Sequence, residues 1–228
     1  MSTASDLHKS QYSQDKFIDE YLKYKENGVF LDIGAHDGVF LSNSYFFEKV
    51  RFWTGLCVEP NPRLYKDLVK NRDCACLDGA VSDKEGMFDF LDLEGVEALG
   101  GLVDKYDPLH RQRVDRDFEK YQGKSRKIIQ VRCYDINKVL EEKGMFHIDY
   151  CSIDTEGGEL EILKSLDLDR FFVASFTIEN NYPSLGFVKR ATHRMRGTSI
   201  EGYLAKKGYR LVEKLGCDEV YVHRSIII

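Results

Sequence analysis

The sequence predicts an α/β fold built on a doubly wound, mostly parallel sheet. Apolar, strand-like runs alternate with helix-like segments from residue 14 to residue 79, which is the pattern of strand–helix–strand units. The run FLDIGAHDG, residues 30–38, takes a buried strand into a glycine turn. Two closing runs, 209–214 and 219–223, form a hairpin, so the last strand is antiparallel.

The elements follow in order along one domain, residues 1–228. An N-terminal helical cap (1–27) holds a helix over 14–25 capped by Ser13, and residues 93–127 form an inserted lid or acceptor-binding segment with a helix around 111–121. Thr198 caps the last helix, which runs to residue 207. The other predicted strands are 29–33, 54–58, 75–77, 87–91, 128–132, 148–153 and 172–178, and the other helices are 43–49, 63–70, 135–143 and 159–165.

Composition limits the function classes. The net charge of −5 over 228 residues argues against broad electrostatic binding to nucleic acid. The apolar runs are strand-sized and the first residues are polar, so we expect no membrane insertion, no signal peptide and a cytoplasmic location. None of the six cysteines forms a C-x-x-C pair, which favours reduced thiols over a zinc site.

The glycine turn predicts the kind of cofactor. Its spacing is D-x-G-x-x-x-G from Asp32 through Gly34 to Gly38, which is neither the dinucleotide fingerprint nor a phosphate-binding loop. A nucleoside cofactor without a pyrophosphate fits, and S-adenosylmethionine is the candidate. We expect Asp32 to organise the turn and the two glycines to let the backbone approach the ligand, although turn geometry alone is the alternative.

Two further strand ends complete the predicted donor site. Glu59 ends the second strand, where a carboxylate accepts hydrogen bonds from ribose hydroxyls; the alternative is a helix-entry acid before Pro60. Asp78 and Ala80 flank the end of the third strand, where an adenine ring would lie.

A second group of polar residues ends two strands that we expect to be neighbours. Asp154, Glu179 and Asn180 offer three oxygen ligands, which suits Mg²⁺ or Mn²⁺. A bound cation would lower the pKa of an acceptor hydroxyl. The alternative is that Asp154 orients the amino group of the methyl donor and Glu179 caps a loop.

Taken in order, these motifs resemble the FkbM-type methyltransferase family. The similarity rests on the glycine turn with its flanks, WTGLCVEPNP, GAVSD, IDTEGGELEIL, IENN and GYRLVEKLGCDEVYV, and it extends from Ser13 to Val222. The resemblance implies a class I, seven-stranded, S-adenosylmethionine-dependent enzyme that methylates a hydroxyl, often of a sugar or glycan. It also implies cofactor-binding roles, carried residue by residue, for Gln14, Asp32, Gly34, Ala35, Gly38, Ser42, Asn43 and Glu59.

The acceptor half of the site departs from related patterns. Asp154, Glu179 and Asn180 are similar to the metal site of catechol O-methyltransferase, but Gly157 stands where a catalytic lysine would be expected. Many family members read Glu-His-Asn where this chain has Glu179-Asn180-Asn181.

Because of these departures, the sequence leaves the identity of the general base open among several residues. Glu156, Glu159 and His193 are candidates for proton acceptor beside Asp154 and Glu179; helix-start acids and a solvated histidine are the alternatives. Possible acceptor contacts, which packing or solvation would equally explain, come from the 93–127 insertion and the 181–197 loop: Tyr106, Tyr182, Phe187, Lys189, Arg190, Arg194 and Arg196.

The function hypothesis is O-methylation of a sugar or glycan hydroxyl, assisted by Mg²⁺ or Mn²⁺. Three alternatives stand beside it: O-methylation of a polyketide, lipid or phenolic acceptor, a nucleotide-sugar dehydrogenase or epimerase, and a non-catalytic nucleoside-binding module. The dehydrogenase would need the dinucleotide spacing, which is absent. The sequence leaves the acceptor, its reacting hydroxyl and the oligomeric state open.

Overall fold

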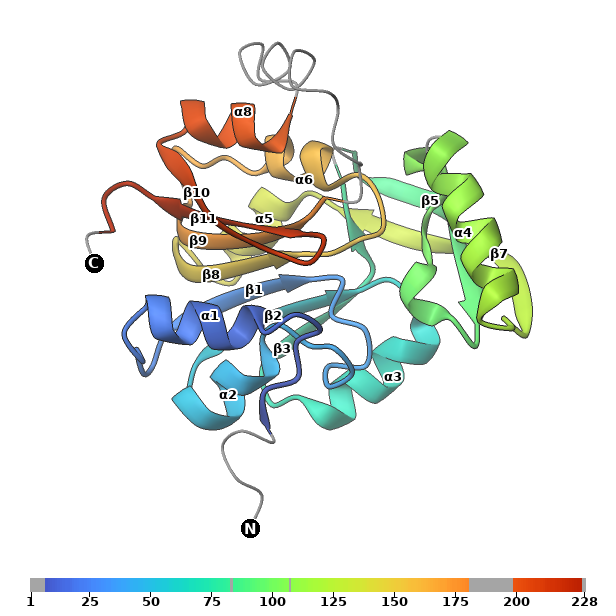
Figure 1. Cartoon of the computed structure of the whole chain (residues 1–228), viewed down its shortest axis with the longest axis horizontal. Coiled ribbons are helices and arrows are strands. Elements are labelled where there is room, and N and C mark those ends of the chain that lie inside the picture. The colour runs from blue at the N-terminus through green and yellow to red at the C-terminus, as the bar shows by residue number, and fades with distance from the viewer. Residues whose placement is uncertain (1–6, 83, 107, 181–198, 227–228) are drawn as a thin grey trace.

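A seven-stranded sheet forms the centre of the molecule, which was analysed as a computed structural model (Figure 1). The structure describes residues 7–82, 84–106, 108–180 and 199–226. The strand order is β10-β11-β9-β8-β1-β2-β3, and only β11 runs against its neighbours, as the sequence predicts. The strands are β1 (Val29–Ile33), β2 (Thr54–Glu59), β3 (Ala75–Asp78), β8 (His147–Ile153), β9 (Phe172–Glu179), β10 (Tyr209–Leu215) and β11 (Asp218–His223).

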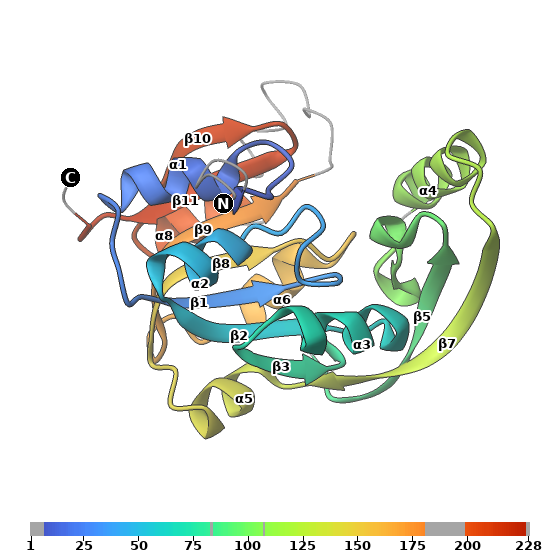
Figure 2. The ribbon, with the colours of Figure 1, turned by 90° about the horizontal axis from the view of Figure 1, so that it is seen from below.

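Helices cover both faces of this sheet, and they give the three layers seen in Figures 1 and 2. Because both faces are covered, the central strands β1, β2, β8 and β9 are almost continuously buried. One face carries α1 (Gln14–Tyr21), α2 (Tyr45–Arg51) and α3 (Pro62–Asn71); the other carries α5 (Ile136–Glu142), α6 (Glu159–Ser165) and α8 (Ile200–Lys206).

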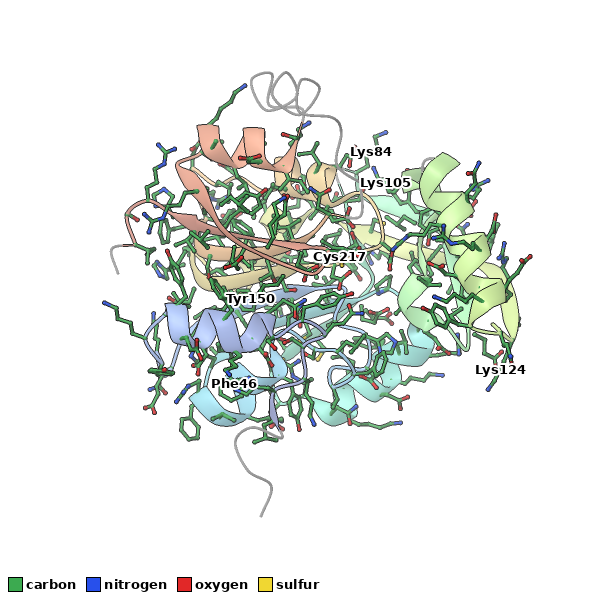
Figure 3. All side chains as sticks on the ribbon, in the orientation of Figure 1. Phe46, Lys84, Lys105, Lys124, Tyr150 and Cys217 are labelled. Carbon is green, nitrogen blue, oxygen red and sulfur yellow. The ribbon has the colours of Figure 1, made fainter. Side chains whose placement is uncertain are left out.

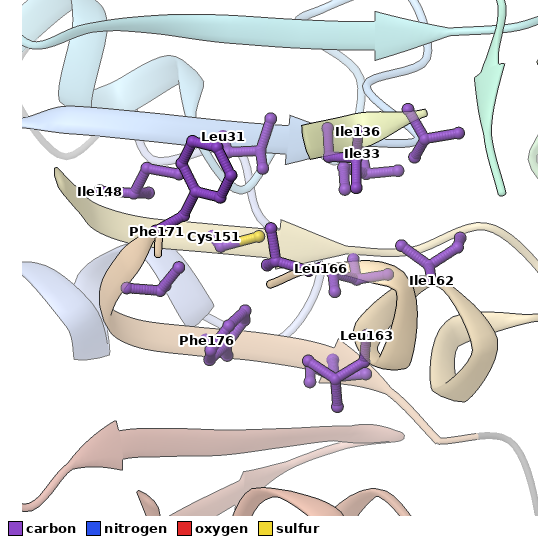
Figure 4. Packing of buried hydrophobic residues seen from close by; sticks show 14 of the residues in the cluster. Leu31, Ile33, Ile136, Ile148, Cys151, Ile162, Leu163, Leu166, Phe171 and Phe176 are labelled. Carbon is purple, nitrogen blue, oxygen red and sulfur yellow. The ribbon is translucent and has the colours of Figure 1, made fainter. Parts of the chain in front are cut away.

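Alternation along the strands divides the core into two clusters. In β1, Leu31 and Ile33 face α5 and α6, whereas Phe30 faces α2, where it packs with Phe46 and Phe47. Figure 4 shows the larger cluster, in which side chains from β1, β8 and β9 meet those of α5 and α6. The two clusters fix the sheet from both sides and so hold the ends of the strands in place.

The predicted insertion is part of a second sheet, with strand order β4-β7-β5-β6. Its long hairpin pairs Gly86 with Cys133 and Glu94 with Ser125, so the strands extend well beyond the predicted 87–91 and 128–132. This arm stands across from the carboxyl ends of the central strands in Figure 2. Its elements are β4 (Ala80–Val81), β5 (Gly86–Glu94), η2 (Glu97–Leu99), β6 (Gly101–Leu102), η3 (Val103–Lys105), α4 (Pro108–Lys120) and β7 (Ser125–Tyr134).

Several predicted helix boundaries are wrong, including the helix predicted over 43–49, which spans Tyr45–Arg51. The first helix ends at Tyr21 rather than residue 25, because Lys23 and Tyr24 have left-handed φ angles of 55° and 59°. Ser13 is itself left-handed, with φ 64°, and its side chain makes no cap hydrogen bond. The last helix is capped by Ser199, whose side chain accepts from the Gly202 N–H, rather than by Thr198.

No helix in the described ranges is long and apolar enough to cross a membrane.

Candidate active site

A cleft opens at the carboxyl ends of β1, β2 and β8, where parallel α/β sheets bind their ligands. It consists of two adjoining open hollows that enclose about 670 and 480 Å³, the solvent at their mouths included. Gly34, His36, Ala98 and Asp154 line both hollows, which makes them parts of one site. Ala98 belongs to the arm, so the arm forms one wall of the cleft.

Gly34 permits a contact between two strands. Its φ is +91°, and an added Cβ would lie 1.7 Å from the carbonyl oxygen of Asp154. The N–H groups of Gly34 and Ala35 both donate to the Val58 carbonyl, at 3.0 Å each. The turn after β1 is therefore tied to β2 and packed against the end of β8, and any side chain at Gly34 would separate them.

Gly38 has a different role from the one predicted. It lines neither hollow, and an added Cβ would stand 2.7 Å from Arg72 Cγ and from Leu68 Cδ1. Its φ of +81° also favours glycine. The second glycine of the motif thus lets the turn pack on α3 and on the residue that follows that helix.

Glu59 lies at the end of β2 and lines the larger hollow, as the ribose prediction requires. Its two carboxylate oxygens accept the N–H groups of His36, at 2.9 Å, and Asn61, at 2.8 Å. Burial raises the pKa of Glu59 to about 8, against the opposing effect of the two N–H groups. Each oxygen keeps a second lone pair, with which it can accept a ligand hydroxyl.

The smaller hollow is lined by several residues of the predicted donor site, Asp32, Ala35, Ser42 and Asn43 among them. Asp32 accepts from the Ser44 hydroxyl at 2.5 Å. Asn43 donates to Ser152 Oγ at 3.0 Å, and its buried Oδ1 has no hydrogen-bond partner among the described residues. A buried acceptor without a partner at the wall of this hollow marks a place where a donor group would bind.

Of the other predicted cofactor residues, one lines a hollow and two do not. Ala80 lines the larger hollow and is buried, whereas Asp78 is exposed and lines neither. Gln14 also lines neither hollow: its side-chain N–H donates to Asp218 at 2.6 Å, and its oxygen accepts from the Tyr12 N–H. Gln14 therefore supports the start of β11 in this structure.

Three carboxylates lie side by side across neighbouring strands. Asp154 follows β8 next to Glu179 at the end of β9, and Asp218 pairs with Glu179 across β9 and β11. The Asp154 side chain is exposed to the cleft, and protein atoms surround it on the other sides. Desolvation by these atoms, followed by the charges of Glu179 and Asp218, raises the pKa of Asp154 well above its usual value. A side-chain hydrogen bond between Asp154 and Glu179 raises the pKa of Asp154 further.

The predicted metal trio is wrong in its third member. Asn180 follows Glu179 directly, and successive side chains of an extended chain point to opposite faces. The Asn180 side chain hydrogen-bonds Glu219 instead, and its N–H donates to the Cys217 carbonyl. Within the described ranges, no group of three or more His, Cys, Asp or Glu side chains is arranged to hold a metal ion.

Glu156 is held by the arm. It has a left-handed φ of 55°, and its carboxylate forms an ion pair with Arg113 of α4. Burial raises the pKa of Glu156 to about 8, and Arg113 opposes that shift. Glu159 accepts from the Gly157 N–H at 2.7 Å and from the Thr155 hydroxyl at 3.0 Å, as a helix-start acid does.

The arm also covers the Gly157–Gly158 turn. An added Cβ on Gly157 would lie 3.3 Å from the Lys105 carbonyl, and one on Gly158 would lie 3.2 Å from the Lys105 side chain. The related pattern has a catalytic lysine at the position of Gly157, on the turn itself. In this structure Lys105, which belongs to the arm, packs over that turn (Figure 3). Tyr106 beside it is buried, and its hydroxyl donates to the Leu99 carbonyl, so it packs within the arm.

Sequence reasoning missed Asp218, Lys105 and Arg113. Pairing of the closing hairpin with β9 was a usable signal for Asp218, whereas nothing local placed the two arm residues. Several predicted residues of the loop after Asn180 lie outside the described residues: Tyr182, Phe187, Lys189, Arg190, His193, Arg194 and Arg196.

The strand order with its single antiparallel strand, together with the cleft at the glycine turn, defines a class I methyltransferase. The model of the methyltransferase FkbM domain matches residues 32–211, most of the chain. The protein belongs to the FkbM methyltransferase family. No curated protein sequence matches it at a significant level.

Solved structures agree with the fold. Methyltransferase FkbM from Methylobacillus flagellatus KT superimposes with a TM-score of 0.54 at 12% identity, covering 97% of this chain and 50% of that one. The chain therefore spans about half the length of that protein. A putative RNA methyltransferase from Pyrococcus horikoshii is more distant, with a TM-score of 0.44, 12% identity and coverage of 93% and 82%. The latter likeness is too remote to bear on the acceptor.

Proposed function

We propose that the protein transfers the methyl group of S-adenosylmethionine to a hydroxyl group. The observation that carries this proposal is the position of the Asp154–Glu179 pair. Asp154, the first member of the pair, packs with its backbone against Gly34 of the glycine turn. A donor cleft and a proton-accepting pair thus share one wall, which is what methyl transfer to oxygen requires.

The reaction needs alignment and removal of one proton. The acceptor oxygen attacks the methyl carbon, a C–O bond forms as the C–S bond breaks, and S-adenosylhomocysteine leaves with the bonding electrons. The hydroxyl proton passes to the ionised oxygen of the Asp154–Glu179 pair. Since desolvation and the charge of Glu179 raise the pKa of Asp154, its ionised carboxylate binds a proton more tightly than an ordinary carboxylate does.

Donor binding is assigned to the two hollows. Glu59 and Ala80 line the larger one and would take the ribose and adenine; Asp32, Ser42 and Asn43 line the smaller one and would take the methionine part. The unsatisfied Oδ1 of Asn43 supports this division, since the α-ammonium group of the donor is rich in N–H donors.

Divalent-metal assistance by Asp154, Glu179 and Asn180 does not fit the side chains as they are placed. The amide of Asn180 is turned to Glu219, and the other two share a hydrogen bond. No step of the proposed reaction therefore passes through a metal ion, and Glu156, paired with Arg113, is not assigned as the base.

A sugar or glycan is the proposed acceptor, on the strength of the family resemblance; polyketide, lipid and phenolic hydroxyls are the second class. The test is transfer of a labelled methyl group to a panel of glycans, phenols and an RNA control. Label on a glycan oxygen supports the proposal. Label on RNA, or no binding of S-adenosylhomocysteine, would contradict it.

A further inference from the structure

Arg72 is a buried cation beside the donor cleft that no catalytic step uses. It follows α3, and its side chain is fully buried. Its guanidinium ion-pairs with Glu48 of α2 and donates to the Gly38 carbonyl at 3.2 Å. A buried charge is tolerated only when its hydrogen bonds are satisfied, and here the partners come from two different elements.

The remaining contacts of Arg72 lie on the segment that joins the glycine turn to α2. Both terminal nitrogens donate to Ser44 Oγ at 3.1 Å, and one is 3.4 Å from Ser42 Oγ. Arg72 therefore hydrogen-bonds to three points on the loop from Gly38 to Ser44, whose residues 40–43 line the smaller hollow. One planar fork of five N–H groups can do this, whereas an ammonium group cannot.

Ser44 passes this constraint on to Asp32. A hydroxyl has a single hydrogen, and here that hydrogen goes to Asp32 Oδ2, while the oxygen accepts from Arg72. The direction of the Ser44 hydroxyl is thereby fixed. Asp32 lines the hollow assigned to the methionine part, so the chain of contacts from Arg72 ends at a carboxylate facing the donor.

We propose that Arg72 and Ser44 are positioning residues for the methyl donor: Arg72 holds the loop from Gly38 to Ser44, and Ser44 aims the Asp32 carboxylate at the cationic methionine end. This inference rests on the proposed donor site. Neither residue touches the reacting atoms. Their effect on the reaction is to preorganise the donor subsite, which spares the ligand the cost of ordering it.

The decisive variant is Ser44→Ala, which removes the link and leaves the buried charge of Arg72 with Glu48. Ser175→Ala is the matched control, because Ser175 is equally buried and its hydroxyl donates to the Asp149 carbonyl at 2.7 Å, away from both hollows. Binding of S-adenosylhomocysteine is measured by calorimetry, and the KM for each substrate by methyl transfer.

We expect Ser44→Ala to weaken S-adenosylhomocysteine binding about tenfold, as the loss of one hydrogen bond to a charged group predicts. The KM for the donor should rise in parallel, with the KM for the acceptor unchanged. Ser44→Thr, which keeps the hydroxyl, should have the S-adenosylhomocysteine affinity and the donor KM of the unaltered protein. Arg72→Lys should show the same donor-specific loss.

A purely structural role gives a different result. If Ser44→Ala and Ser175→Ala lose stability alike and bind S-adenosylhomocysteine as the unaltered protein does, the positioning role is overturned. If the unaltered protein itself fails to bind S-adenosylhomocysteine, the donor site is wrong and this proposal falls with it, so the two failures are told apart.

Discussion

The carbonyl oxygen of Asp154 occupies the space that a side chain on Gly34 would need, since a Cβ there would lie 1.7 Å away. The Asp154 N–H in turn donates to the Ile33 carbonyl at 2.9 Å. The donor turn and the acidic pair are thus joined through their backbones. A backbone shift in one therefore moves the other, so donor binding and the placement of the base are coupled through the main chain.

The first prediction concerns this contact. Gly34→Ala should abolish S-adenosylhomocysteine binding and lower the free energy of unfolding by more than the ~1–2 kcal/mol that a left-handed φ costs a residue with a Cβ. Gly144→Ala is the control, because Gly144 also has a positive φ, +68°, but an added Cβ would meet no atom within 4 Å. Equal losses in urea titrations of the two variants would show that the contact adds nothing.

The second prediction concerns the proton acceptor. Asp154→Asn and Glu179→Gln should each lower kcat by about 10²- to 10⁴-fold, the range for loss of general base catalysis, with little change in S-adenosylhomocysteine affinity. Asp218→Asn should have a smaller effect, because Asp218 accepts from Gln14 and acts on the pair through its charge. Full turnover by both of the first two variants would reject the pair as the base.

The third prediction concerns divalent metal ions. Because the proposed step uses a carboxylate pair, methyl transfer should persist after chelation with EDTA and dialysis. The measurement is initial rate with and without EDTA, followed by added Mg²⁺ or Mn²⁺. Loss of activity that either ion restores would instead mean that Asp154 and Glu179 rearrange around a metal on binding, with Asp218 as the nearest further carboxylate.

The sheet could be predicted because its signals are local: β1 and α6 fall on the predicted residues, acids end β2 and β9, and Asp32 lies one residue before the end of β1. The arm could not, because β5 and β7 pair across a long insertion and their partners are set by packing under α4. The metal trio failed on side-chain direction. Glu179 and Asn180 are adjacent and face opposite ways, whereas Asp218, on the neighbouring strand, shares the face of Glu179.

The fourth prediction follows from the raised pKa of Glu59. With a pKa of about 8 when folded and an ordinary value when unfolded, Glu59 binds its proton more tightly in the native state. Stability should therefore fall as pH rises from about 4.5 to 8, by ~1.4 kcal/mol for each unit of pKa difference. Glu59→Gln should flatten this slope in urea titrations at pH 5, 6.5 and 8. An unchanged slope would reject the shift.

The last prediction concerns the Arg113–Glu156 ion pair, here called the clasp, which joins the arm to the acceptor half of the site. Arg113 of α4 pairs with Glu156, and its buried Nε has no hydrogen-bond partner in the described part of the chain. Arg113→Met leaves a buried carboxylate without its cation, which costs several kcal/mol for a well-buried pair.

The effect of Arg113→Met should fall on the acceptor rather than the donor. We expect a higher acceptor KM with a smaller change in donor KM, because the pair fixes the arm against the residues next to Asp154, and Glu156 lines the larger hollow but not the smaller one that contains Asp32. Arg116→Met is the control, since Arg116 lies on the same helix and 71% of its side chain is exposed. Similar kinetics for the two variants would show that the clasp plays no part in acceptor binding.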